Sequence, residues 1–217
     1  MLTRHDRTVE DCLEVLDAIA PIGLGHIGFK DVGVDARTLQ ALNAGIKATG
    51  AASYMEVVST SRQACLQSAR VAVDIGVDHL LGGTEVADIV SILNGSDIGY
   101  YPFPGHPSGH PTVLGGAPDD IAGHCRAFVE AGCAGADLLA YRATDADPLA
   151  LVRAARAALG DARLIVAGSV DSCERIRALD AAGADAFTIG SAVFDGSFSP
   201  HKGLLSSRLR DVLACCG

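Results

Sequence analysis

Short apolar runs alternate with longer segments of helical periodicity along the whole chain. Each run has the length of a buried parallel strand, and each longer segment repeats its apolar residues every three or four positions. Strands are predicted at 1–4, 25–30, 53–58, 79–81, 98–101 and 137–140 and within 164–170 and 186–192, with helices at 8–20, 36–49, 62–75, 85–93, 119–131, 148–159, 172–183 and 204–214. This alternation predicts an α/β fold in which residues 1–217 form one (β/α)8 TIM barrel. An open doubly wound sheet is the alternative, and the lack of a dinucleotide fingerprint disfavours it.

The last two predicted strands both end in Gly-Ser, as Gly168-Ser169 and Gly190-Ser191. Parallel strands present their C-terminal ends at the same edge, where free backbone N–H groups bind anions. In barrels of this kind, the last two strand-to-helix loops often form a phosphate site. The alternative is that both dipeptides only make tight strand exits, since turns use Gly and Ser freely.

Residues 166–198 contain Ala-Gly-Ser-Val, Ala-Gly-Ala-Asp and Ile-Gly-Ser-Ala-Val-Phe-Asp-Gly. This stretch resembles the C-terminal quarter of the ribulose-phosphate-binding barrels. The histidine-biosynthesis sugar isomerase and cyclase are the most similar members, and phosphoribosylanthranilate isomerase and the phosphosugar epimerases are more distant. The resemblance implies a TIM barrel that holds a phosphorylated ligand near Gly168, Ser169, Gly190 and Ser191. It leaves the reaction open, because the superfamily contains isomerases, epimerases, aldolases and decarboxylases.

An echo of this motif lies half a chain earlier. The segments 58–60 and 81–84 repeat the arrangement of 168–169 and 189–192 at an offset of 108 to 110 residues. If the echo is a true repeat, Thr60, Gly82 and Gly83 form a second anion site across the barrel mouth. The alternative is that many helix-to-strand turns share this sequence.

Lys30, at the end of the second strand, is the leading candidate for chemistry. The chain has three Lys against 14 Arg, so a Lys at this place is an unusual choice. As a neutral amine, Lys30 could form a Schiff base, and as an ammonium ion it could stabilise an enediolate or hold an anion. Glu56 is an acidic residue within the apolar run of the neighbouring strand, so we expect it to pair with Lys30 and move a proton. The alternative is a lysine at the rim of the barrel, paired with Asp31 or Asp35.

Other polar residues follow the predicted strands. Arg4 could bind a carboxylate or a phosphate with its bidentate fork, and His5 could act as an acid or base. Arg142, after the sixth strand, offers another cation for the substrate. Asp137 comes early in that strand and is interpreted as a structural residue facing the bottom of the barrel. For each of the others, a solvated position at the rim is the alternative.

The segment 102–116 is long for a strand-to-helix connection. Its alternating Pro and Gly suit a lid that closes over a ligand, with His106 and His110 as candidate acid–base groups. A metal site at these two histidines is disfavoured, because neither a Cys nor a second carboxylate shares their spacing. We therefore assign no metal.

Composition limits the partners of this chain. A net charge of −9 argues against nucleic acid binding, and no apolar run approaches the roughly 20 residues that span a bilayer. The seven Cys and the absence of a signal-peptide pattern predict free thiols in a reducing cytoplasm, with Cys215 and Cys216 as tail thiols. No cofactor motif is present, so we expect no cofactor. Ala-rich helices are compatible with a homo-oligomer.

These observations predict a cytoplasmic enzyme that acts on a small phosphorylated sugar or sugar acid by carbonyl or enediolate chemistry. The leading hypothesis is an aldolase-type lyase with Lys30 and Glu56 at its centre. The alternatives are a cofactor-independent phosphosugar isomerase or epimerase, and a non-catalytic protein that binds phosphorylated metabolites.

Overall fold

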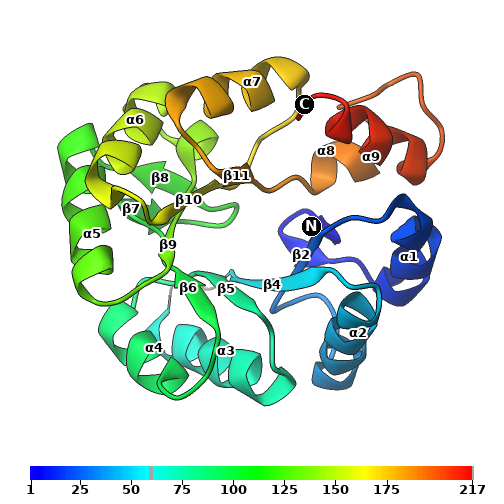
Figure 1. The fold of residues 1–217 in the computed structure, drawn as a ribbon, viewed down its shortest axis with the longest axis horizontal. Coiled ribbons are helices and arrows are strands. Elements are labelled where there is room, and N and C mark those ends of the chain that lie inside the picture. The colour runs from blue at the N-terminus through cyan, green and yellow to red at the C-terminus, as the bar shows by residue number, and fades with distance from the viewer. Residues whose placement is uncertain (59–60, 217) are drawn as a thin grey trace.

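A ring of helices surrounds a ring of strands in the computed structural model, which describes residues 1–58 and 61–216 (Figure 1). Parallel strands alternate with helices, so the predicted α/β barrel is confirmed. One parallel sheet has the order β3-β4-β5-β6 and the other β11-β10-β9. Their bounds are β3 His26–Lys30, β4 Ala52–Val57, β5 His79–Gly82, β6 Gly99–Tyr101, β9 Gly135–Leu138, β10 Arg163–Val166 and β11 Ala186–Phe187.

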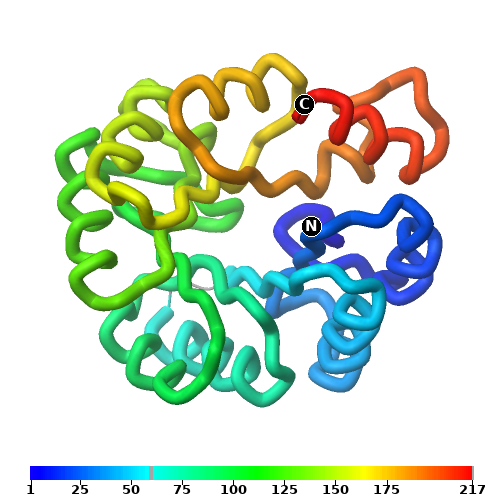
Figure 2. The backbone as a smooth tube through the Cα atoms, in the orientation of Figure 1, coloured from blue at the N-terminus to red at the C-terminus, as the bar shows by residue number. Residues whose placement is uncertain are grey.

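Hydrogen bonds outside the regular ladders join the two sheets into one barrel. On one side, the backbone N–H of Asp137 donates to the carbonyl of Pro102 (3.0 Å). On the other side, the segment at residues 1–2 lies between β3 and the end of β11. Here the Leu2 N–H donates to the Gly28 carbonyl (2.7 Å) and the Met1 amino group to the Ile189 carbonyl (2.8 Å). The first and last parts of the chain therefore meet in the ring, as the tube in Figure 2 shows.

The helices pack their apolar stripes against the outside of the sheets. They are α1 Cys12–Ile19, η1 Ala20–Ile22, α2 Ala36–Ala48, α3 Arg62–Ile75, α4 Val86–Leu93, α5 Pro118–Glu130, η2 Ala140–Arg142, α6 Pro148–Leu159, α7 Cys173–Ala182, α8 Ser191–Phe194 and α9 Leu205–Leu213. Asp35, Asp147 and Ser172 cap α2, α6 and α7 by accepting backbone N–H groups in the first turn. Within the described residues, no helix is long and apolar enough to cross a bilayer.

Strand register decides which side chains enter the barrel. Tyr54, Leu81, Tyr101 and Ile165 form an apolar cluster of their own on the inner face. Successive side chains of a strand point to opposite faces, so Glu56 shares the inner face with Tyr54. Lys30 is paired in register with Glu56. Both charged side chains therefore lie within the barrel near the C-terminal ends of the strands.

Two hairpins differ from the prediction. The first strand folds into a hairpin of β1 (Thr3–Arg4) and β2 (Arg7–Thr8), because a tight turn at His5 and Asp6 reverses the chain. The segment 102–116 contains the hairpin of β7 (His106–Ser108) and β8 (Val113–Gly115). This second hairpin is fastened to the chain after η2, since the Thr144 N–H donates to the Leu114 carbonyl (3.0 Å).

The prediction that all seven cysteines are free thiols is wrong for two of them. Cys173 and Cys215 form a disulfide, although 42 positions separate them in the sequence. Cys173 begins α7 and Cys215 follows α9, and the barrel brings these two helix ends together. Because that contact is made only in the folded chain, the spacing of the cysteines could not predict it.

Candidate functional site

A cavity of about 490 Å³ opens at the C-terminal ends of the strands. Its lining comes from segments far apart in the sequence, which the barrel brings together: the β1–β2 turn, β3, β4, the β7–β8 turn, η2 and the loops after β10 and β11. The polar side chains in it include His5, Asp6, Lys30, Glu56 and Arg142, together with Ser169 and Ser191.

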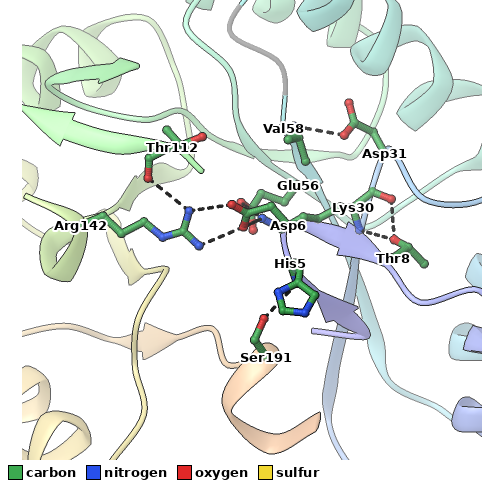
Figure 3. A network of polar contacts seen from close by, with 10 residues as sticks. All are labelled: His5, Asp6, Thr8, Lys30, Asp31, Glu56, Val58, Thr112, Arg142 and Ser191. Carbon is green, nitrogen blue, oxygen red and sulfur yellow. Dashed lines mark hydrogen bonds and ion pairs between the residues drawn. The ribbon is translucent and has the colours of Figure 1, made fainter. Parts of the chain in front are cut away.

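The predicted pair of Lys30 and Glu56 is present. The Lys30 Nζ lies 2.9 Å from Glu56 Oε1 and 2.8 Å from Asp6 Oδ1 (Figure 3). Each of the three side chains is less than a tenth exposed, at 7% for Lys30, 8% for Asp6 and 7% for Glu56. Lys30 is therefore a buried amine that contacts two possible proton acceptors. It is not the rim lysine of the alternative interpretation.

Asp6 also forms an ion pair with a second cation, Arg142. Arg142 donates from both terminal nitrogens to the two oxygens of Asp6, at 2.9 and 3.0 Å, and also to the Thr112 carbonyl at 3.3 Å. This fork geometry fixes the guanidinium as well as its charge. Asp6 thus joins the cations of β3 and η2 into one network.

The β1–β2 turn reaches the network because Thr8 holds it against β3. The Thr8 hydroxyl donates to the Lys30 carbonyl and accepts the Lys30 N–H, both at 2.8 Å. His5 and Asp6 have positive φ, at 51° and 58°, and Ser169 has 56°. Within the described residues these are the non-glycine positions with positive φ, and all three line the cavity. Strained backbone of this kind concentrates at functional sites.

Charge compensation governs the ionisation of the network. Burial opposes the charge of Lys30, but the carboxylates of Glu56 and Asp6 outweigh it and raise the Lys30 pKa above its usual value. Burial also disfavours the Asp6 carboxylate, yet hydrogen bonds from Arg142 and the charge of Lys30 hold the Asp6 pKa well below its usual range. Lys30 is consequently an ammonium ion in the resting protein.

The two Gly-Ser exits line the same cavity. Gly168 has φ of 78°, and a Cβ there would collide with the Arg142 side chain. A Cβ at Gly190 would collide with Thr3. The His5 N–H donates to the Ser191 hydroxyl at 3.2 Å (Figure 3). Glycine is required at both exits because the network and the first hairpin pack directly against them.

The remaining predicted residues are distributed differently. Arg4 pairs with Asp195 (2.9 Å) and lies outside the cavity lining. His110 lines the cavity, whereas the His106 ring packs against His124 (centroids 5.7 Å apart). Residues 106 and 110 therefore differ in their access to a ligand.

The predicted second anion site has no counterpart in this cavity. Gly83 lies against Ile89 and Tyr100, and Phe103 packs over Gly82. Neither glycine is part of the lining. Thr60 falls outside the described residues.

Asp6 and Asp137 are the site residues that sequence reasoning missed. Asp6 also follows the first predicted strand, but the hairpin that turns it inward was not predicted. The interpretation of Asp137 as facing the bottom is wrong: its side chain is fully buried, and Glu56, Lys30 and Arg142 act on it electrostatically. A carboxylate within a strand was the available signal.

No three His, Cys, Asp or Glu side chains of residues 1–58 and 61–216 are grouped as metal ligands.

Comparisons with known proteins support the fold. No protein-family model and no curated protein matches the chain. Among solved structures, orotidine 5'-phosphate decarboxylase from Pyrococcus horikoshii is similar with a TM-score of 0.67 and 10% identity, covering 94% of this chain and 92% of that one. A 4-hydroxy-2-oxoglutarate/2-dehydro-3-deoxyphosphogluconate aldolase has a TM-score of 0.62 and 14% identity, covering 97% and 90%. A mandelate oxidase mutant with an FMN adduct has a TM-score of 0.63 and 16% identity, covering 99% and 73%.

These similarities place the chain among TIM-barrel structures, and the neighbours are enzymes. At such low identities they establish the fold alone. A decarboxylase, an aldolase and an oxidase perform different reactions, so the chemistry must be argued from the side chains of the cavity.

Proposed function

We propose that this protein is an enzyme that acts on a small phosphorylated carbonyl compound, as an aldolase-type lyase with Lys30 as its nucleophile. The observation that carries the proposal is the contact of a buried lysine with two carboxylates in the wall of a 490 Å³ cavity. A nucleophilic lysine needs a neighbouring group that removes its proton, and Glu56 is within hydrogen-bonding distance of the Nζ.

We propose that the loops after β10 and β11 bind the phosphate of the substrate. Gly168-Ser169 and Gly190-Ser191 face the cavity after β10 and β11, where this fold commonly binds phosphate. Hydroxyl and backbone donors there would hold the phosphate, and the carbonyl end would then extend toward Lys30. The cavity volume suits a small metabolite rather than a polymer.

The proposed reaction needs only proton transfers among these groups. Glu56 takes a proton from Lys30, the amine attacks the substrate carbonyl, and the attacking nitrogen passes a proton to the oxygen to form the carbinolamine. Glu56 then returns its proton to the carbinolamine hydroxyl, which leaves as water. The bond between the α and β carbons then breaks, and its electron pair forms the enamine and neutralises the iminium, while Glu56 takes the proton of the hydroxyl on the departing β carbon. Glu56 then protonates the enamine, and water hydrolyses the iminium to release the product and restore the Lys30 ammonium ion.

A second candidate is a cofactor-independent isomerase or epimerase, and the raised pKa of Lys30 favours it. In that reaction Glu56 removes a proton from the carbon beside the carbonyl. The Lys30 ammonium ion stabilises the negative oxygen of the enediolate. Glu56 then returns the proton to the neighbouring carbon or to the opposite face.

Borohydride trapping separates the two candidates. The chain is incubated with a phosphorylated triose ketone or aldehyde, reduced and analysed by peptide mass spectrometry, with Lys47 and Lys202 as internal controls. The lyase predicts a substrate-dependent adduct on Lys30 alone. Turnover without an adduct, accompanied by exchange of the substrate C–H in deuterated water, supports the isomerase. Phosphate binding without conversion or exchange of any probe supports the non-catalytic alternative.

A further inference from the structure

The charges beneath the cavity do not balance if every acidic side chain is ionised. Two cations, Lys30 and Arg142, face the carboxyl groups of Asp6, Glu56 and Asp137. The buried Met1 amino group also interacts with Glu56, but burial lowers its pKa to about 6, so it is mostly uncharged at pH 7. Asp6 contacts both cations and Glu56 contacts Lys30. Asp137 is the remaining carboxyl group.

Asp137 occupies the inner face of β9. It is in register with Ile165 of β10, which belongs to the inner cluster with Tyr54, Leu81 and Tyr101. Its side chain is 0% exposed, and both carboxyl oxygens lack a hydrogen-bond partner among the described residues. Its backbone N–H donates to the Pro102 carbonyl at 3.0 Å.

An ionised carboxylate at this position would be costly. A buried charge without hydrogen bonds is unfavourable by several kcal/mol or more, and such a group neutralises instead. The inner-face neighbours Leu81 and Ile165 are apolar, and burial raises the pKa of the Tyr101 phenol, which keeps it neutral. Burial and the charge of Glu56 likewise raise the pKa of Asp137 well above its usual value, against the opposing effect of Lys30 and Arg142.

We propose that Asp137 carries a proton in the resting protein and acts as a positioning residue for the Lys30–Glu56 pair. A neutral Asp137 leaves the two cations to Asp6 and Glu56, so the ammonium ion stays beside Glu56. An ionised Asp137 would add a second negative charge beneath Glu56 and compete for Lys30 and Arg142. The positioning role rests on the proposed function, whereas the bound proton does not.

Carboxyl-carbon NMR of the intact, uniformly labelled chain tests the proton directly. The Asp137 Cγ resonance is assigned through its own side-chain and backbone carbons, so no variant is needed. We expect the chemical shift of a protonated carboxyl group at pH 7, where an ordinary Asp side chain is a carboxylate. An Asp137 resonance that titrates near pH 4, the ordinary value for Asp, would overturn the proposal.

Asp137→Asn provides a second test, because the amide is neutral at every pH. A folded-state pKa above the unfolded value means that wild-type stability falls as pH rises from about 4 toward the folded value. The urea midpoint of the variant relative to wild type should therefore rise between pH 4 and pH 8. A constant difference would contradict the proposal.

A rate measurement then tests positioning. With a phosphorylated triose that the enzyme converts, the ratio of the Asp137→Asn rate to the wild-type rate should rise as the pH increases from 7 to 9, because the amide cannot ionise. An unchanged ratio would contradict the positioning role. If no probe is converted or trapped, the proposed function fails while the NMR result still decides the protonation of Asp137.

Discussion

Replacing Lys30 with Met tests the buried ion network most severely. The substitution keeps a long apolar stem but removes the ammonium group that lies 2.8 Å from Asp6 and 2.9 Å from Glu56. Asp6 retains the bidentate contact with Arg142, so the loss falls mainly on Glu56. Glu56 would then be a buried carboxylate without its cation.

Breaking a buried ion pair by removing one partner costs about 3–5 kcal/mol. Because Asp6 keeps Arg142 and the cavity admits water, we expect the lower end, about 3 kcal/mol. For a chain of this length, that loss lowers the midpoint of thermal unfolding by about 6–12 °C. An unpaired buried carboxylate is relieved when it gains a proton, so the deficit should shrink as the pH falls from 7 to 5.

Urea denaturation at pH 7 and pH 5 measures this deficit. Lys47→Met is the matched control, because Lys47 pairs with Asp78 at 3.1 Å but is 44% exposed, and its loss should cost less than about 1 kcal/mol. The double variant Lys30→Met, Glu56→Gln should recover much of the stability. A Lys30→Met variant as stable as Lys47→Met, or one with the same deficit at both pH values, would refute the reasoning.

Three further perturbations address the rest of the site. Gly168→Ala should weaken binding of inorganic phosphate roughly tenfold, the equivalent of one charge-assisted hydrogen bond, because the new Cβ displaces Arg142. Calorimetry measures this affinity. The control is Gly132→Ala, because Gly132 has a similar φ but lies in open space, and this variant should bind phosphate as the wild type does. Asp6→Asn should lose less stability on acidification than the wild type does. The lowered pKa of Asp6 stabilises the wild-type fold above about pH 4, and this contribution is lost as the pH falls below that value. A variant as acid-sensitive as wild type would contradict this assignment. Ser191→Ala removes the acceptor of the His5 N–H and should raise KM for a phosphorylated probe more than it lowers kcat; the reverse pattern would argue against a binding role.

The sequence predicts the barrel well because its signals are local. Strand-length apolar runs and capped helices fix the alternation, and most predicted boundaries differ from the structure by one or two residues. The pairing of Lys30 with Glu56 was also accessible. Neighbouring parallel strands lie side by side, so a lysine and a glutamate near the same strand ends meet in register.

The rest of the network depends on contacts between distant segments. Asp6 joins Lys30 through the turn of the first hairpin, and Arg142 reaches Asp6 across 136 positions. The disulfide between Cys173 and Cys215 likewise depends on helix ends that meet only in the barrel. Neither periodicity nor spacing carries this information.

A crystal structure with a bound phosphorylated triose tests the central claim most directly. We predict that the phosphate lies between Gly168-Ser169 and Gly190-Ser191 and that the carbonyl carbon lies within about 3.5 Å of the Lys30 Nζ. A phosphate bound elsewhere, or a carbonyl group directed away from Lys30 and Glu56, would contradict it.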